Sequence, residues 1–445
     1  MPRKYSVRRH LRTSDTESLV DRLHCVTVHV VTRHTPYMRS LFIFFSLAAI
    51  ACEAGTSARA SQLPTARTAS AARDSTPTAP ALPDTVRRSD TTIVRGLYIL
   101  RWAAQSPARM KQLIAIADST EINAFVIDVK DEFGLNYRSS DTLVARNAGN
   151  AGTIPNLKAM VDTMKAHGII PIARIVVFKD SVAARLNPQH TIRKPDGTAW
   201  RDKEGLTWVS AYDPRIWEYN IRVAEDMARA GFAEIQFDYI RFPEPYRSLP
   251  TQVFPTANGR TKPQALAEFL RTACPRIRAL GAKCTIDVFG LTTTVPNALE
   301  IGQQWETLSP LVDVMLPMTY PSHYPRGAFN LPRPNAEPYR VNYLAIKRAR
   351  ERDAKLGIDD SGHVRAWLQA FSLPRMLPKY GPRELEEQKR AIYEAGYDSW
   401  ILWNPGARYE SFIPGLEKTT VSRRTRQAPA APAPVAAPTA EARTP

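Results

Sequence analysis

Short apolar stretches recur at regular intervals along the middle of the chain, and each is about as long as one buried strand. The clearest example is AEIQFDYIRFP, in which apolar and polar residues alternate from Ala233 until Pro243 ends the run. Eight stretches of this kind predict strands at residues 96–102, 124–129, 169–177, 234–240, 283–289, 312–318, 364–371 and 399–403.

Helical patterns fill the gaps between the predicted strands. Met110, Leu113 and Ile114 follow one another at helical spacing. Asp213 before Pro214 is typical of a helix start, and several of the patterns end at a glycine. We expect helices at residues 106–118, 154–167, 213–231, 263–280, 339–356 and 383–395.

Strand and helix alternate eight times, which favours a (β/α)8 TIM barrel over a doubly wound sheet. A doubly wound sheet would predict a glycine-rich phosphate turn after the first strand, and GLYILRW contains no such turn. The barrel domain is expected at residues 92–417. Its long loops, at residues 178–212, 243–262 and 319–338, follow predicted strands and therefore belong to the face that carries active sites.

The residues ahead of the barrel contain an export signal. An apolar run at residues 41–51 is too short to span a membrane, follows a positive segment at Met38 and ends at Cys52. We expect residues 1–37 to be a mis-called upstream leader and residues 38–52 to be a signal peptide. The ending AIAC resembles a bacterial lipoprotein box with Cys52 as the lipidated residue, and simple secretion is the alternative.

Low-complexity segments flank the predicted barrel on both sides. Residues 53–91 are rich in Ala, Ser, Thr and Pro, and residues 418–445 are an Ala/Pro-rich tail whose Ala/Pro repeat begins at about Gln427. Neither segment can bury enough apolar surface to fold, so we expect a disordered linker and a disordered, extended tail. This organisation predicts an exported protein of the cell envelope, lipid-anchored at the outer membrane or the periplasmic face, or else secreted.

The net charge of +17 suggests nucleic acid until it is located. Much of the excess falls in the flanking segments, and no motif combines basic and aromatic residues as a nucleic-acid module would. The histidines show no ligand spacing, so neither a metal nor another cofactor is predicted. Cys274 and Cys284 are expected either to pair in an exported protein or to remain buried thiols.

Polar residues gather near the carboxyl ends of the predicted strands, where a parallel barrel places its chemistry. Acids, arginines and aromatic rings in one place suit a sugar site, because carboxyls cleave the glycosidic bond and rings stack on sugar faces. Besides the two acids considered next, the candidate substrate-binding residues are Asp128, Arg174, Trp200, Arg241, Tyr320, His323, Trp403 and Asn404.

Asp238 and Asp287 are the predicted catalytic pair, since they end neighbouring strands about 4.8 Å apart. Asp238, close to Arg241, is expected to stay ionised as nucleophile or stabiliser of the oxocarbenium ion. Asp287, flanked by Val288 and Phe289, is expected to keep its proton through burial and to act as the acid. The structural alternatives are an ion pair of Asp238 with Arg241 or Arg174, and a buried, hydrogen-bonded Asp287.

Other candidates also have structural alternatives. Asp128 suits a positioning role or an ion pair with Lys130 or Arg174 better than direct chemistry. His323 is expected to contact substrate or to anchor its loop, and Trp403 could belong to the core. Trp200 lies in a predicted loop and is expected to offer an exposed stacking face.

Seven segments carry a family resemblance: RGLYILRWA, NAFVIDVKDEFG, IIPIARIVVFKD, AEIQFDYIRFP, CTIDVFG, DVMLPMTYPSHY and WILWNPGARY. With these segments the chain resembles, over residues 92–412, a bacterial family of glycoside hydrolase TIM barrels. That family was first catalogued as a domain of unknown function and is distantly related to the alpha-amylase-like barrels. The resemblance implies glycosidic-bond hydrolysis, with a nucleophile after strand four and an acid after strand five. Those positions correspond to Asp238 and Asp287, although the acid of alpha-amylase-like barrels is normally Glu.

Two functions follow as hypotheses. The first is a glycoside hydrolase that cleaves an envelope or extracellular polysaccharide or oligosaccharide by a two-carboxylate mechanism. The second is a carbohydrate-binding lipoprotein that keeps the barrel scaffold without turnover. The direction of Asp287 discriminates between them, because an Asp287 that points away from the cleft favours binding alone. A lyase or a deacetylase is a weaker alternative.

Overall fold

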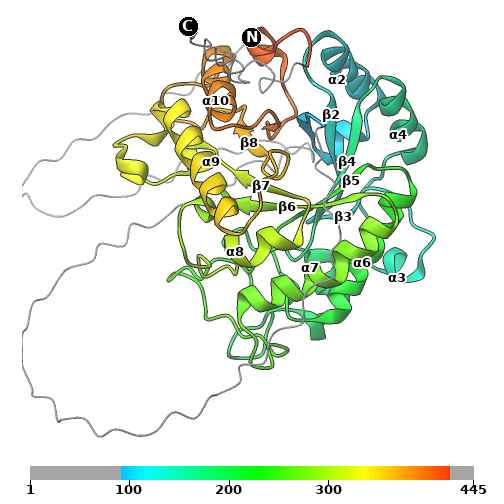
Figure 1. The fold of residues 1–445 in the computed structure, drawn as a ribbon. Helices are drawn as coiled ribbons and strands as arrows, with labels where there is room; N and C mark the ends of the chain where they lie inside the picture. Colours follow the sequence, from blue (N-terminus) through cyan, green and yellow to red (C-terminus); the bar gives the residue numbers. More distant parts are fainter. Residues whose placement is uncertain (1–91, 421–445) are drawn as a thin grey trace, which may run out of the picture. The chain divides into compact units, whose positions relative to one another are not determined.

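The computed structural model describes residues 92–420 of the chain, and within them eight parallel strands close into a barrel (Figure 1). Each strand pairs with the next along the chain, and the first pairs with the last through the register of Gly96 and Ile401. The predicted (β/α)8 TIM barrel is confirmed. The leader, the signal peptide with Cys52, the linker and residues 421–445 lie outside the described residues.

The strands occur where the apolar stretches predict them, to within a few residues. One short strand, β3 (Gly134–Leu135), runs antiparallel to the end of β2. The barrel strands are β1 (Arg95–Ile99), β2 (Ala124–Asp131), β4 (Ile170–Val176), β5 (Glu234–Asp238), β6 (Lys283–Phe289), β7 (Val314–Met318), β8 (Ala366–Gln369) and β9 (Trp400–Trp403).

Long helices surround the barrel, and their ends follow the capping signals of the sequence. The Asp213 side chain accepts from the backbone N–H of Arg215, and Pro214 takes the first helical position. The α-helices are α1 (Arg101–Ala104), α2 (Pro107–Ser119), α3 (Thr142–Arg146), α4 (Leu157–Ala166), α5 (Ser181–Leu186), α6 (Pro214–Arg229), α7 (Lys262–Ala279), α8 (Trp305–Leu308), α9 (Pro338–Lys355) and α10 (Pro382–Glu394).

The first strand ends earlier than the sequence predicts. Arg101 and Trp102 were expected to end this strand, and instead they begin the short helix α1. The reason lies in the Arg101 guanidinium, which forms two hydrogen bonds to the carboxylate of Asp131. The turn into α1 buries Arg101 against the end of β2 and leaves Trp102 exposed.

Alternation along the strands divides the core into two layers. Side chains such as Tyr98, Val126 and Trp367 form one cluster inside the barrel. Their neighbours along the strands, such as Ile127 and Phe237, join the larger cluster between the strands and the helices. The interior of the barrel is therefore filled by packed side chains. The polar side chains among them lie only at certain heights along the barrel.

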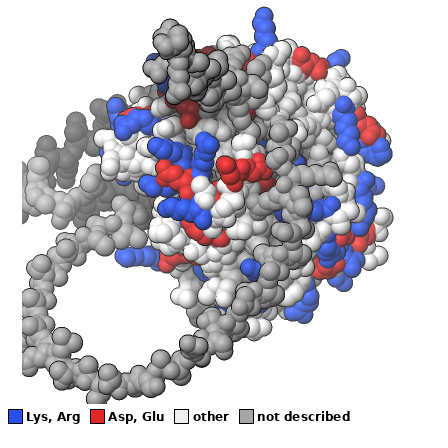
Figure 2. Space-filling view, viewed as in Figure 1, with Lys and Arg blue, Asp and Glu red and all other residues white. Residues whose placement is uncertain are grey.

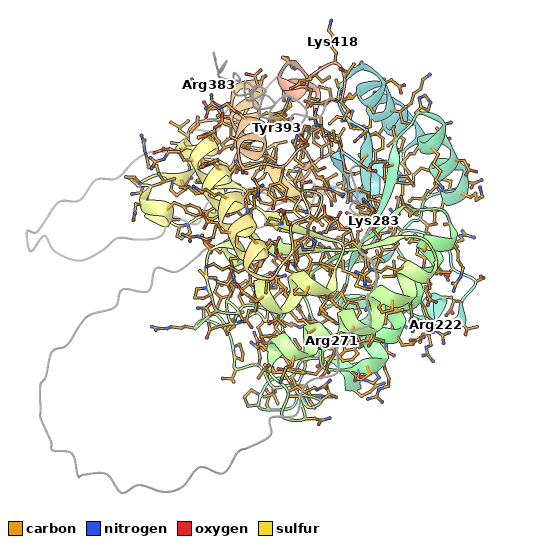
Figure 3. The ribbon with its side chains drawn as sticks, viewed as in Figure 1. Arg222, Arg271, Lys283, Arg383, Tyr393 and Lys418 are labelled. Atoms are coloured by element: carbon orange, nitrogen blue, oxygen red, sulfur yellow. A yellow bond between two sulfur atoms is a disulfide. The ribbon has the colours of Figure 1, made fainter. Side chains whose placement is uncertain are left out.

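A buried ion pair closes the end of the barrel at which the strands begin. Arg365 donates to both carboxylate oxygens of Glu234, at 2.6 and 3.1 Å, and both side chains are buried. Lys283, which lies among the strands in the middle of the ring in Figure 3, is 3.9 Å from the same carboxylate. Burial and the nearby Arg365 lower the pKa of Lys283 to about 8. Arg222 and Arg383 instead project from the outer surface (Figure 3).

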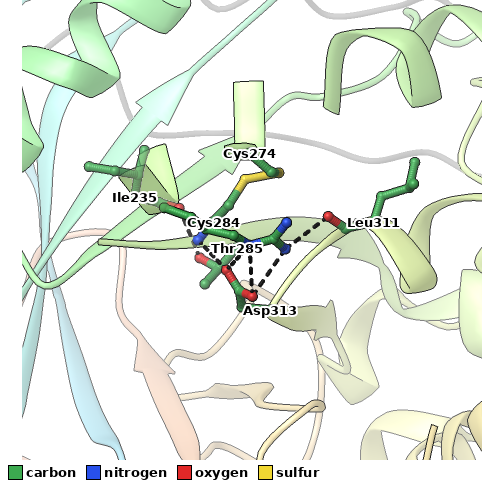
Figure 4. Close-up of a disulfide and its surroundings, with 7 residues drawn as sticks. Ile235, Cys274, Cys284, Thr285, Leu311 and Asp313 are labelled. Atoms are coloured by element: carbon green, nitrogen blue, oxygen red, sulfur yellow. Dashed lines mark hydrogen bonds and ion pairs between the residues drawn. A yellow bond between two sulfur atoms is a disulfide. The ribbon is translucent and has the colours of Figure 1, made fainter. Parts of the chain in front are cut away.

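A disulfide joins Cys274 of α7 to Cys284 of β6 (Figure 4). Of the two states left open by the sequence, the structure therefore has the paired one. Asp313, beside the bridge, accepts from the backbone N–H of Cys284 at 2.8 Å and from Arg278 of α7 at 3.0 Å. The bridge and these polar contacts fasten α7 to the barrel wall.

Charges of both signs are interspersed over the face of the described residues that Figure 2 shows. Many of them form ion pairs, such as Arg276 with Glu218 at 2.6 Å and Arg222 with Glu218 at 2.8 Å. No helix within residues 92–420 is both long and apolar enough to cross a membrane.

Candidate active site

Asp238 ends β5 at the mouth of the barrel, meaning the end at which the strands finish. The next residue, Tyr239, has a left-handed backbone with φ of 49° and donates its N–H to Asp238 Oδ1 at 2.6 Å. Such a conformation is costly for a residue with a side chain and is typical of functional sites. It turns the chain sharply and fixes the carboxylate at the mouth.

Arg174 of β4 binds two carboxylates at once. Its Nε donates to Asp238 Oδ2 at 3.0 Å, and its Nη1 donates to Asp128 of β2. The hydroxyl of Tyr98 donates to the other oxygen of Asp128 at 2.5 Å. Burial raises the pKa of Asp128, and Arg174 opposes this effect. Of the two ion pairs predicted for Asp128, the one with Arg174 is confirmed.

The other predicted pair of Asp128 does not form. The register between β2 and β4 shifts between Asp128 and Lys130, and this bulge turns Lys130 away from the barrel interior. Lys130 forms an ion pair with Asp180 at 2.8 Å and lies over the ring of Tyr219.

Asp287 lies beside Asp238, one position beyond the paired residues Phe237 and Ile286. Its Oδ1 accepts from Trp367 Nε1 of β8 at 2.6 Å, and its two oxygens accept from Gln236 at 2.9 and 3.0 Å. The residue is only 1% exposed. Burial, and then the negative charge of Asp238, raise the pKa of Asp287 well above its usual value. Asp287 therefore points into the barrel, and its neutral form is favoured.

Aromatic rings line one side of the mouth. Tyr320 stacks on Trp403 with centroids 5.5 Å apart, and Phe371 meets Trp403 edge-on at 5.0 Å. His323 lies against Tyr320 and Phe371, and burial lowers its pKa to about 4, so its neutral form dominates at neutral pH. Tyr320 and Trp403 thus lie close together, as the sequence predicts for candidate substrate-binding residues.

The expectation of an exposed stacking face at Trp200 is wrong. Trp200 is fully buried, and its indole N–H donates to the carbonyl of Pro250 at 2.8 Å. The long loop in which it lies folds back on itself through short antiparallel bridges, which enclose the ring. The exposed rings are instead Trp102, 52% exposed after β1, and Phe133, 38% exposed after β2.

Arg241 does not pair with Asp238 through a hydrogen bond. Its guanidinium lies between the rings of Trp208, Tyr239 and Phe289 at 4.8–5.0 Å and forms an ion pair with Glu244 at 2.9 Å. The ion pair of Asp238 is the one with Arg174, which the sequence left as an alternative. Arg241 is buried beneath the mouth and organises the loop after β5.

Asn404 holds the loop after β9. Its amide donates to the carbonyl of Ala370 at 2.6 Å, and its oxygen accepts from the backbone N–H groups of Gly406 and Arg408. The contacts of Asn404 are therefore with its own and the neighbouring loop.

Sequence reasoning missed Glu132, which follows β2 at the mouth. Burial, and then the nearby Asp131, raise its pKa to about 7, while Lys179 lowers it. The signal was present in VIDVKDE, where four charged residues end one apolar strand. Asp128 and Lys130 continue the alternation of the strand, so the strand pattern indicates them. Glu132 lies in the turn beyond the strand, where that pattern indicates nothing.

No group of three or more His, Cys, Asp or Glu side chains within residues 92–420 is arranged to hold a metal ion. The chemistry available from the described mouth is that of carboxyls, a guanidinium, a lysine and aromatic rings. A (β/α)8 barrel with paired carboxyls and aromatic faces at its mouth is the arrangement by which glycoside hydrolases act on sugars.

The chain belongs to the family described as "Putative glycosyl hydrolase domain", whose model matches residues 96–409. This match covers the whole barrel, from β1 to the loop after β9. The resemblance seen in the sequence is thereby confirmed, and the class of enzyme is that of the glycoside hydrolases.

Three solved structures are similar to the chain, and the first of them has a TM-score above 0.5. The glycoside hydrolase domain of PgaB (BpsB) from Bordetella bronchiseptica is 14% identical, with a TM-score of 0.53 over 73% of this chain and 99% of that one. A hypothetical protein from Ruminiclostridium thermocellum is 34% identical over 43% of this chain and 97% of its own, with a TM-score of 0.39. An exo-beta-N-acetylglucosaminidase from Vibrio harveyi is 14% identical over 75% and 55%, with a TM-score of 0.47. No curated protein matches the chain.

Proposed function

We propose that this protein hydrolyses the glycosidic bonds of an envelope or extracellular polysaccharide by a two-carboxylate mechanism. Asp238 is the ionised carboxylate beside the anomeric carbon, where it attacks that carbon or stabilises the oxocarbenium ion. Asp287 is the second carboxyl of the mouth and remains neutral. A proton from a neutral carboxyl must reach the leaving oxygen as the bond breaks.

The observation that carries the proposal is the contrast between two neighbouring acids. Asp238 forms an ion pair with Arg174, while burial and then the negative charge of Asp238 raise the pKa of Asp287. Adjacent acids driven toward opposite charge states are typical of acid–base pairs in hydrolases. Asp287 points into the barrel, on the same side of the strands as Asp238, rather than outward toward the helices.

The aromatic rings support a sugar as the ligand. Tyr320 and Trp403 form a stacked pair beside the carboxyls, and Trp102 exposes a large apolar face after β1. Flat rings of this kind pack against the C–H faces of sugars, while polar groups bind the hydroxyls.

The proposed site of action is the cell envelope. The Cys274–Cys284 disulfide supports an oxidising compartment, since such bonds are rare in the cytosol. The export signal and the lipidation of Cys52, both inferred from the sequence, place the barrel on a membrane surface in this proposal, with residues 53–91 as its linker.

A screen for reducing sugars tests the proposal. The wild-type protein, incubated with a panel of bacterial polysaccharides, is expected to release reducing ends from at least one of them. Asp238→Asn should lower that rate about 1,000-fold or more, because an amide can neither attack carbon nor balance a positive charge. Its unfolding temperature should fall by only a few degrees, because Arg174 keeps Asp128 as a partner.

Asp162→Asn is the matched control, because Asp162 is a surface residue of α4 that pairs only with Lys158 in the described contacts. This variant should remain fully active. An Asp238→Asn variant that keeps its activity, or a wild type that binds glycans tightly without cleaving any, would contradict the proposal. The second result would favour the carbohydrate-binding alternative.

A further inference from the structure

Glu132 lies at the first position of a two-residue turn between β2 and β3. Asp131 pairs with Gly134 across this turn, and Gly134 has a φ of 101°. A Cβ at Gly134 would lie 2.2 Å from the carbonyl oxygen of Ala148, so the turn fits closely against the next loop. A turn this short and this enclosed gives Glu132 little freedom of backbone position.

Arg101 fixes the same turn from the other side. Its guanidinium donates to both carboxylate oxygens of Asp131, at 2.7 and 2.8 Å, and to the carbonyl of Leu135 at 3.0 Å. It also donates to the carbonyl of Gly134. One buried side chain thus holds both strands of the hairpin. The residue between them is presented at the mouth on a rigid support, as an acid that must meet a substrate atom requires.

The Glu132 carboxyl interacts electrostatically with groups at the mouth of the barrel. The charged and titratable groups that act on it are Asp131 beside it and Lys179 and Arg174 from the β4 side. Glu132 in turn acts on Tyr98 of β1 and Tyr239 after β5. Arg174 and Tyr239 also bind Asp238, so Glu132 and Asp238 share two neighbours.

Glu132 is half-buried, and among the described contacts its side chain has no hydrogen bond or ion pair to another side chain. Lys179 instead binds Glu204 and lies 5.1 Å from the ring centroid of Tyr239. A half-buried carboxyl without a side-chain partner gives a structure little stability, and it is available to a ligand.

Asp287 has the opposite surroundings. Trp367 and Gln236 occupy its oxygens, and it is almost fully enclosed by the barrel. Asp287 lies next to Asp238 on the neighbouring strand, so a proton on Asp287 removes a like charge from beside Asp238. That proton has no direct route to an oxygen outside the barrel.

We propose that Glu132 is the proton donor of the reaction and that Asp287 is a positioning residue for Asp238. This inference rests on the proposed function. The Glu132 O–H bond breaks as its proton passes to the glycosidic oxygen, and the electrons of the C–O bond leave with that oxygen. Asp238 attacks the anomeric carbon or stabilises the oxocarbenium ion that forms there. When water then adds to that carbon, it returns a proton to Glu132, so the enzyme ends in its starting state.

The charge state of Glu132 supports this role. Burial and the neighbouring Asp131 bring its pKa to about 7, so it both holds and releases a proton near neutral pH. Trp102 and Phe133 are exposed after β1 and β2, on the same side of the mouth as Glu132, and offer rings to the sugar beyond the cleaved bond.

Leaving-group dependence tests the assignment. The substrates are the polysaccharide cleaved in the screen and a 2,4-dinitrophenyl glycoside of the sugar it releases, whose leaving oxygen needs no proton. Glu132→Gln should lose about 100- to 10,000-fold on the polysaccharide and little on the aryl glycoside. Asp287→Asn should lose activity on both. Glu386→Gln, an exposed change on α10, should leave both rates unaltered.

A second readout does not depend on turnover. One component of the infrared absorption of protonated carboxyls should disappear as the pH rises through about 7 in the wild type, and this step should be missing from Glu132→Gln. If the wild type cleaves both substrates and Glu132→Gln matches it on the polysaccharide, the inference is overturned while the proposed function stands. A loss on both substrates by Glu132→Gln would also overturn it. A wild type that cleaves neither substrate overturns the proposed function and the inference together.

Discussion

Arg174 determines how charge is distributed among the acids at the mouth. It binds Asp128 and Asp238 directly and acts through space on Glu132 and Asp287. Burial raises the pKa of Asp128, Asp287 and Glu132, and Arg174 opposes this effect at each of them. The charge of Arg174 is thus shared among several acids of the mouth.

Glu132 should also link the stability of the protein to pH. Folding raises its pKa to about 7, so the unfolded chain releases this proton at a lower pH than the folded one. Between the ordinary glutamate pKa and about 7 the folded state binds more protons, so this contribution to the free energy of unfolding falls as the pH rises. When the free energy of unfolding is measured by denaturant titration at pH values from about 5 to about 8, it should fall less steeply with pH in Glu132→Gln than in the wild type. A slope equal to that of the wild type would place the Glu132 pKa near its ordinary value, and Glu386→Gln serves as the control.

At the scale of elements, the irregular end of β2 determines the surroundings of the charged residues that it carries. The bulge in β2 separates Asp128, which faces the barrel interior, from Lys130, which faces α6 through Tyr219. The hairpin to β3 then returns the chain to the mouth and presents Glu132. Two local irregularities in one strand therefore assign three charged residues to three different surroundings.

The disulfide between α7 and β6 should contribute measurably to stability. It closes a loop with a sequence separation of 10 residues, for which the loss of chain entropy predicts about 3 kcal/mol. A variant with Cys274→Ala and Cys284→Ala should lose up to that free energy of unfolding, measured by denaturant titration. Wild-type protein under reducing conditions should unfold at the same denaturant concentration as the variant. Equal stability of variant and oxidised wild type would show that the bridge contributes nothing.

At the scale of the whole molecule, the barrel is one part of a longer chain with a predicted export signal. If Cys52 carries lipid, the protein should sediment with membranes of the bacterium that produces it and be released by detergent. Cys52→Ala should move it to the soluble fraction without changing the rate of polysaccharide cleavage, because Cys52 lies outside the barrel domain. Labelling with radioactive palmitate measures the modification directly. A membrane-bound Cys52→Ala variant, or an unlabelled wild type, would favour secretion without a lipid anchor.

The sequence alone determined the architecture. The signals that predict it are local, so they can be recognised without knowing which distant residues are in contact. They are the strand and helix periodicity, the caps at Asp213 and Ser106, and the polar residues at strand ends. For the same reason Asp238, which ends an alternating strand, could be identified as a candidate from its own neighbours in the chain.

Tertiary structure decided the surroundings of each side chain. Nothing local to Trp200 reveals that its loop folds over it, and nothing local to Glu132 reveals that Lys179 lies near it at the barrel mouth. Burial and charge state depend on groups that are distant in sequence and are brought together only when the barrel closes. The fold could therefore be predicted from pattern, whereas the pairing of Arg174 and the access to each carboxyl required the structure.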